Sequence, residues 1–172
     1  QLAECKQQIG KSAAVHTTHI DITDSEHIQV EAERIIKQKL TPDIIVNCAG
    51  IVVGKMFHEH SPDEIKATID VNTTGSMLVV RAFLDAMMER KTGHIVNLAS
   101  ASGYIGNPRM SIYAASKWAI LGWTESLRLE MHKLQTGIRV TSVIPSYIKT
   151  GMFDGVKAPV LVPMLETNKI AE

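Results

Sequence analysis

The segments HIVNLAS, residues 94–100, and YAASK, residues 113–117, are the most informative part of this sequence. The first is an apolar run that predicts a buried strand with Ser100 at its carboxyl end. The second lies in a helical pattern that runs from Ser111 to Leu134 and is ended by Gly137. A buried strand followed by a long helix is typical of a parallel α/β fold.

The pair Tyr113 and Lys117 suggests proton transfer. On a helix, residues four apart share a face, with Cβ atoms about 5–6 Å apart. A tyrosine ordinarily titrates near pH ~10, and a neighbouring ammonium lowers that pKa toward the neutral range, where proton transfer is most efficient. Ser100 would hold a substrate oxygen beside the tyrosine. Alone, Tyr-x-x-x-Lys is a weak motif, because most such pairs are one aromatic and one solvated lysine.

Helices and strands alternate along the rest of the chain. The segment Ser61-Pro62-Asp63-Glu64 predicts a helix start with a capping box, and Asn72 to Gly75 predicts a break in the helix that follows. Gly93 would close that helix at about Arg90. The other expected strands cover 14–20, 43–47 (buried) and 138–144, and the other expected helices cover 1–9 and 25–40.

This alternation predicts βαβ units and a mostly parallel sheet, in which ligands bind at the carboxyl ends of the strands. Four polar or small segments are expected at those ends: Asp21, 47–50, Ser100 and 145–150. We therefore expect residues 1–172 to form one α/β domain, or part of one, with its site at that edge.

Bulk composition excludes several classes of protein. The 172 residues are 45% hydrophobic and 21% charged, with zero formal net charge and no basic block that would favour nucleic-acid binding. Only Cys5 and Cys48 are present, which fits a reducing, cytoplasmic location, and no apolar run reaches the ~18 residues of a membrane span. The chain begins without Met inside a helical pattern, so we expect a piece of a longer protein; an anchor preceding Gln1 would bring it to a membrane.

Together these residues resemble the short-chain dehydrogenase/reductase family over nearly the whole chain. The matching motifs are Asn47-Cys48-Ala49-Gly50, Val71-Asn72-Thr73-Thr74-Gly75, the Ser100–Tyr113–Lys117 set and Pro145-Ser146-Tyr147-Ile148-Lys149-Thr150. Residues 148–155 and 161–166 look most like the epidermal retinol dehydrogenase-like branch of that family.

The resemblance implies a Rossmann-type doubly wound sheet and an oxidoreductase that uses NAD or NADP to interconvert an alcohol and a ketone or aldehyde. It implies that Tyr113 is the acid/base, Lys117 lowers its pKa and binds the nicotinamide ribose, Ser100 binds the substrate oxygen and Asn72 anchors a proton-relay water. It implies a cofactor-binding set of Asp21, Ile22, Asn47, Ala49, Gly50, Tyr113, Lys117, Pro145, Ile148 and Thr150.

The resemblance also has departures. The glycine-rich turn that holds the cofactor pyrophosphate is absent, and with it the first strand, first helix and second strand; the usual C-terminal helix and last strand are absent too, and Ser146 replaces a glycine. In the family's strand order the missing strands lie between those expected at 14–20 and 43–47, so we expect unpaired strand edges and an open apolar face. A homo-oligomer is expected of the full-length protein, formed by the helices at 73–90 and 111–134.

The apolar residues that follow Thr150 predict a hydrophobic substrate, such as a retinoid, steroid or long-chain alcohol; core packing or a membrane-facing lid are the alternatives. A non-catalytic binding or scaffold protein, or an inactive piece of the enzyme, is the main rival function. A serine hydrolase is disfavoured because Ser100 lacks a Gly-x-Ser-x-Gly elbow. His58-Glu59-His60 lacks a third metal ligand, and Cys48 is expected to be a small buried filler.

Overall fold

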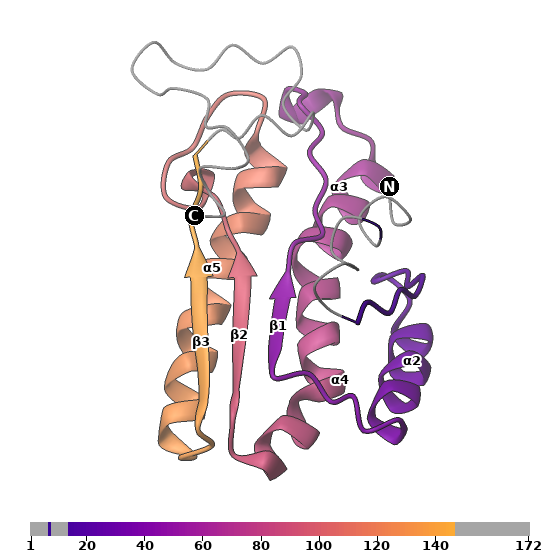
Figure 1. The fold of residues 1–172 in the computed structure, drawn as a ribbon. Helices are drawn as coiled ribbons and strands as arrows, with labels where there is room; N and C mark the ends of the chain where they lie inside the picture. The colour runs from indigo at the N-terminus through magenta and orange to yellow at the C-terminus, as the bar shows by residue number, and fades with distance from the viewer. Residues whose placement is uncertain (1–6, 8–13, 147–172) are drawn as a thin grey trace.

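A computed structural model of the chain describes Gln7 and residues 14–146. Three parallel strands form a sheet in the order β1-β2-β3, with β1 at Ile44–Asn47, β2 at Gly93–Leu98 and β3 at Ile138–Val143. Strands β1 and β2 are each followed by helical structure that leads to the next strand, as expected of parallel βαβ units (Figure 1). The α/β class with a Rossmann-type parallel sheet is therefore confirmed.

The helices match the sequence pattern closely. They are α2 at Ser25–Lys37, α3 at Pro62–Ile69, α4 at Gly75–Arg90 and α5 at Ser111–Lys133, with short turns η1 at Phe57–Glu59 and η3 at Ala101–Gly103. The expected break between α3 and α4 is a π-helical segment, η2, at Asp70–Thr74. The helix predicted over 1–9 lies almost wholly outside the described residues.

The predicted capping box at the start of α3 is confirmed. The Ser61 hydroxyl accepts from the Glu64 amide at 3.2 Å, and the Glu64 carboxylate accepts from the Ser61 amide at 2.9 Å. Two orphan amides of the helix start are satisfied in this way. The end of α4 differs from the expectation: Lys91, not Gly93, takes the left-handed conformation (φ 53°), and Gly93 instead opens β2.

The core lies between the sheet and α4 with α5. Ile45, Ile95 and Val140 are in register across the three strands and are buried with Met87 of α4 and Met131 of α5. Helix α2 packs against α4 at the side of this layer (Figure 1). Within the described residues, no helix combines the length and apolar character needed to cross a membrane.

The other face and one edge of the sheet are open in the described part of the chain. Ile44 and Val46 of β1 are 60% and 53% exposed. The prediction of a buried strand is therefore wrong for these two side chains, and within the described residues this part of the sheet is an open apolar face, as expected. The predicted strand over 14–20 is also wrong: these residues form no strand, because no neighbouring strand offers them backbone partners.

Candidate active site

Helix α5 holds Tyr113 and Lys117 on its first turns, and both side chains are buried, with 5% exposure each. The Lys117 ammonium lies 5.7 Å from the centre of the Tyr113 ring and donates to the Leu98 carbonyl of β2 at 2.7 Å. Burial lowers the pKa of Lys117, because water no longer solvates the ammonium. The four-residue spacing thus places a tyrosine and a desolvated cation together.

Ser100 follows β2 and caps η3. Its hydroxyl oxygen accepts from the Ser102 backbone amide at 3.1 Å. The turn η3 packs on α5 at Gly103, where an added methyl would lie 3.1 Å from the Lys117 carbonyl oxygen. This close approach brings the strand end that carries Ser100 to the helical turn that carries Lys117.

Asn72 lies inside η2 and is 1% exposed. Its Oδ1 accepts from the Ile51 amide at 2.7 Å, and its Nδ2 donates to the Ile51 carbonyl at 2.9 Å and to the Ser116 hydroxyl at 3.0 Å. The Asn72 side chain therefore joins the turn after β1 to α5.

The turn after β1 borders the same space. A methyl added to Gly50 would lie 3.4 Å from Asn72 Oδ1 and 3.8 Å from Lys117 Nζ, so glycine leaves room between these groups. Ala49 is exposed, and the side-chain Nδ2 of Asn47 donates to Asn97 Oδ1 at 2.8 Å. The segment is therefore anchored at Asn47 and open at Ala49 and Gly50, as a surface that receives a ligand must be.

Cys48 corrects the expectation of a buried filler, because it is an exposed free thiol. Neighbouring protein atoms desolvate the sulfur in part and raise its pKa, while the Lys117 ammonium acts in the opposite direction. The thiol therefore lies within electrostatic reach of the lysine, in a turn that also carries Gly50.

Of the remaining predicted residues, the structure describes Asp21, Ile22 and Pro145. Asp21 is exposed and accepts from the amide and hydroxyl of Thr23, bonds that lower the pKa of its carboxyl. Ile22 packs on Gly75 at the start of α4, where an added methyl would lie 2.7 Å from the Ile22 carbonyl oxygen. The Pro145 carbonyl accepts from the Ala101 amide at 2.9 Å, beside Ser100. Ile148, Thr150 and the apolar loop after them lie outside the described residues.

Sequence reasoning missed a set of buried polar side chains behind this cluster. Ser116 links Asn72 to α5, and Asn97 links Asn47 of β1 to Thr124 of α5, with Asn97 Nδ2 donating to Thr124 Oγ1 at 2.9 Å. The available signal was an asparagine at an inward-facing strand position, where apolar residues are the rule. Within the described part of the chain, no group of three or more metal-binding side chains is found.

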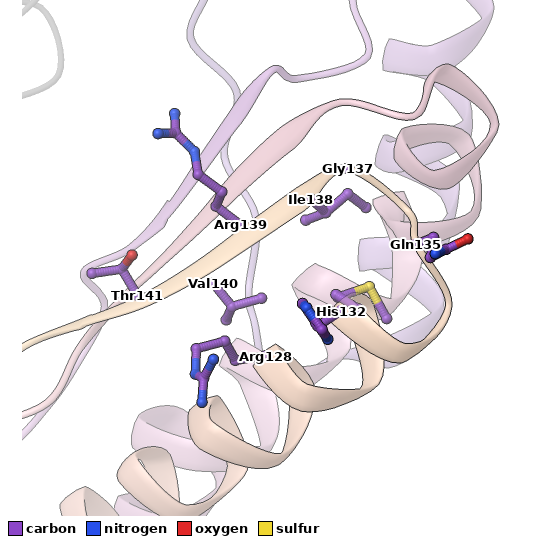
Figure 2. Close-up of a pocket in the computed structure, with 9 residues that line it drawn as sticks. Arg128, His132, Gln135, Gly137, Ile138, Arg139, Val140 and Thr141 are labelled. Carbon is purple, nitrogen blue, oxygen red and sulfur yellow. The ribbon is translucent and has the colours of Figure 1, made fainter.

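A separate hollow lies away from this cluster, between the last turns of α5 and the edge strand β3 (Figure 2). Arg128, His132 and Gln135 come from α5 and the turn that follows it, and Ile138 and Val140 from β3. Gly137, which begins the return into β3, is left-handed (φ 75°). None of the predicted site residues lines the hollow, so the cluster around Tyr113 and Lys117 remains the candidate site.

Comparison with known proteins identifies the same family that the sequence motifs resemble. A family model described as "short chain dehydrogenase" matches residues 1–160. Mouse epidermal retinol dehydrogenase 2 is 39% identical over 158 residues, which cover 90% of this chain and 51% of that protein. Human estradiol 17-beta-dehydrogenase 11 is 32% identical over 169 residues, covering 98% of this chain and 55% of that protein.

A solved structure of 4-hydroxyisoleucine dehydrogenase, complexed with NADH and succinate, superimposes with a TM-score of 0.76 at 32% identity. The match covers 85% of this chain and 74% of that one. The chain spans about half the length of the two curated relatives it matches.

Proposed function

The chain belongs to the short-chain dehydrogenase family, and on that basis we propose that the protein is an NAD- or NADP-dependent oxidoreductase that interconverts an alcohol and a ketone or aldehyde. The observation that carries this proposal is the pairing of Tyr113 with the buried ammonium of Lys117, beside the open turn at Gly50. Buried titratable groups with shifted pKa values gather at catalytic sites, so a desolvated lysine beside this turn favours an enzyme over a binding or scaffold protein.

The residues present fit the nicotinamide end of the cofactor. Gly50 leaves space beside Asn72 and Lys117 that a larger side chain would fill, and Lys117 offers a donor to the ribose hydroxyls. Asn47, Ala49, Asp21 and Ile22 would hold the adenosine part, and Pro145, Ile148 and Thr150 would hold the carboxamide. When bound, the nicotinamide donates or accepts the hydride.

The chain's own part in the reaction is proton transfer and orientation. In the reducing direction Tyr113 gives its phenolic proton to the substrate oxygen, and in the oxidising direction it takes the hydroxyl proton. Ser100 donates its hydroxyl hydrogen to the same oxygen, since its lone pair already accepts from Ser102. Lys117 favours the phenolate of Tyr113, and Asn72 orders the path by which the proton returns to solvent.

The substrate proposed is apolar, such as a retinoid, a steroid or a long-chain alcohol. The names of the mouse and human relatives, a retinol dehydrogenase and an estradiol dehydrogenase, support this class. The run of apolar residues after Thr150 in the sequence is consistent with it. A homo-oligomer formed through α4 and α5 is proposed for the full-length protein, and the exposed Trp118 on α5 suits such a contact.

The test is nicotinamide turnover by the full-length protein with a panel of apolar alcohols and ketones. Tyr113→Phe should lower kcat by about 10²–10⁴-fold, the range of a lost acid/base. Tyr104→Phe, which changes a tyrosine that is 63% exposed, is the matched control and should keep full turnover. Absence of turnover and of cofactor binding in the wild-type protein would favour the scaffold alternative.

A further inference from the structure

We propose that Ser116 is a positioning residue that fixes Asn72 against the helical turn carrying Tyr113 and Lys117. The inference rests on the proposed function, because the reaction it serves is the proton transfer assigned to those residues. Ser116 itself would touch neither substrate nor cofactor, since its side chain is completely buried (0% exposed).

The donor and acceptor roles of the Ser116 hydroxyl are fixed by its two partners. Its hydroxyl donates to the Tyr113 carbonyl at 2.7 Å, and a hydroxyl has a single hydrogen to give. The lone pairs that remain accept from Asn72 Nδ2 at 3.0 Å. The backbone of Tyr113 is thereby connected to the side chain of Asn72 through one oxygen atom.

Asn72 has its other contacts on the turn after β1. The amide and carbonyl of Ile51 bind its Oδ1 and Nδ2, so both Nδ2 hydrogens are directed at fixed acceptors, Ile51 O and Ser116 Oγ. Removing the Ser116 hydroxyl would leave one of these hydrogens buried without an acceptor. The Asn72 amide would then reorient or admit water, and the turn at Gly50 would lose its register with α5.

A second bond makes this inference testable without dismantling the helix contact. The Thr73 hydroxyl donates to the Ser116 backbone carbonyl at 3.2 Å. Because this bond uses the main chain of Ser116, it survives the change Ser116→Ala and keeps η2 packed on α5. Ser116→Ala therefore removes the link to Asn72 and leaves the neighbouring attachment in place.

The primary experiment compares Ser116→Ala with wild type in the full-length protein. We expect kcat to fall about tenfold with KM for substrate changed less than twofold, and the pH profile of kcat to shift, since proton transfer depends on close alignment. Thr68→Val is the matched control. It removes another buried helical hydroxyl, which donates to the Glu64 carbonyl of its own helix at 2.8 Å, and should leave kcat and the pH profile unchanged.

A double-mutant cycle with Asn72→Ala separates positioning through Asn72 from any other effect. Adding Ser116→Ala to Asn72→Ala should lower kcat less than twofold further, because the contact is already gone. A further tenfold loss, or a Ser116→Ala enzyme with wild-type kcat and pH profile, would overturn the proposal. Ser116→Cys, which keeps the volume but accepts hydrogen bonds weakly, replaces the alanine variant if that variant does not fold.

The double-mutant cycle of Ser116→Ala and Asn72→Ala can also be measured through the free energy of unfolding, which does not depend on enzyme activity. The two changes should be non-additive if the contact exists, and additivity would overturn the link between Ser116 and Asn72. A wild-type protein without turnover but with non-additive unfolding energies would refute the proposed function while leaving the contact established.

Discussion

The Lys117 ammonium lies 5.7 Å from the centre of the Tyr113 ring, and the two side chains are 5% exposed. Among the described residues, the Lys117 ammonium is held by the Leu98 carbonyl, to which it donates a hydrogen bond. Burying an ammonium is costly to the fold, because a carbonyl dipole replaces only part of the lost hydration. Lys117 is therefore expected to serve function at the expense of stability.

Replacing this lysine should make the protein more stable and inactive. Lys117→Met fills similar volume without a buried charge and should raise the free energy of unfolding at pH 7 by about 1 kcal/mol, measured by denaturant titration without cofactor. Turnover should fall at least about 10²-fold. Lys133→Met, at an exposed position of α5, should change neither quantity. A less stable Lys117→Met protein would contradict this account.

The destabilising effect of the buried Lys117 ammonium should also be seen in how the free energy of unfolding changes with pH. Burial places the folded-state pKa of Lys117 below the unfolded value of about 10.4. Between these two values the unfolded chain binds more protons than the folded one, so this lysine makes the free energy of unfolding rise with pH. The raised pKa of Cys48 acts with opposite sign and is itself lowered by the Lys117 ammonium, so both proteins are compared in a Cys48→Ser background. The difference between the two proteins should shrink as pH rises through that window.

Gly50 should control cofactor affinity more than stability. In Gly50→Ala the added methyl meets Asn72 Oδ1 at 3.4 Å and Lys117 Nζ at 3.8 Å, which are ordinary contacts that the fold tolerates. The methyl occupies space proposed for the cofactor, so the Kd for the nicotinamide nucleotide should rise about tenfold, or 1.4 kcal/mol, by calorimetry. Gly106→Ala, where an added methyl meets nothing within 4 Å, is the control. An unchanged Kd for Gly50→Ala would remove Gly50 from the cofactor site.

Asn97 should be essential to the stability of the sheet–helix contact. It is 0% exposed and bonds Asn47 on one side and Thr124 on the other. Asn97→Ala strips a partner from each of these groups, at a cost of about 1–3 kcal/mol per buried unsatisfied group. Thermal unfolding should show the loss, and Thr124→Val combined with Asn97→Ala should cost less than the sum of the single changes. Additive losses would mean that the two side chains are not coupled.

The capping box at α3 gives a prediction independent of function. Ser61→Ala should lower the free energy of unfolding by about 1 kcal/mol, because the Glu64 amide loses its acceptor. Ser61→Asp keeps an acceptor at the same position and should stay within a few tenths of wild type. Equal destabilisation by both variants would show that the hydroxyl has another role.

Local sequence signals were sufficient for the elements and for the central pair of the site. Capping residues, apolar periodicity and a four-residue spacing act over one or two helical turns. The cap at Ser61, the start of α2, the extent of α5 to within one residue and the pairing of Tyr113 with Lys117 could therefore be predicted, whereas α2 ends at Lys37 and not at residue 40. The roles assigned to Tyr113, Lys117, Ser100, Asn72 and the cofactor-binding residues remain predictions.

Tertiary structure decided what depends on partners distant in the sequence. Residues 14–20 have strand-like composition but form no strand, and Ile44 and Val46 are exposed, because pairing and coverage come from other segments. The contacts of Ser116 with Asn72 and of Asn97 with Thr124 join residues 44 and 27 positions apart. No local pattern specifies which buried polar atoms meet at such separations; only the packing of α5 against η2 and β2 brings these donors and acceptors together.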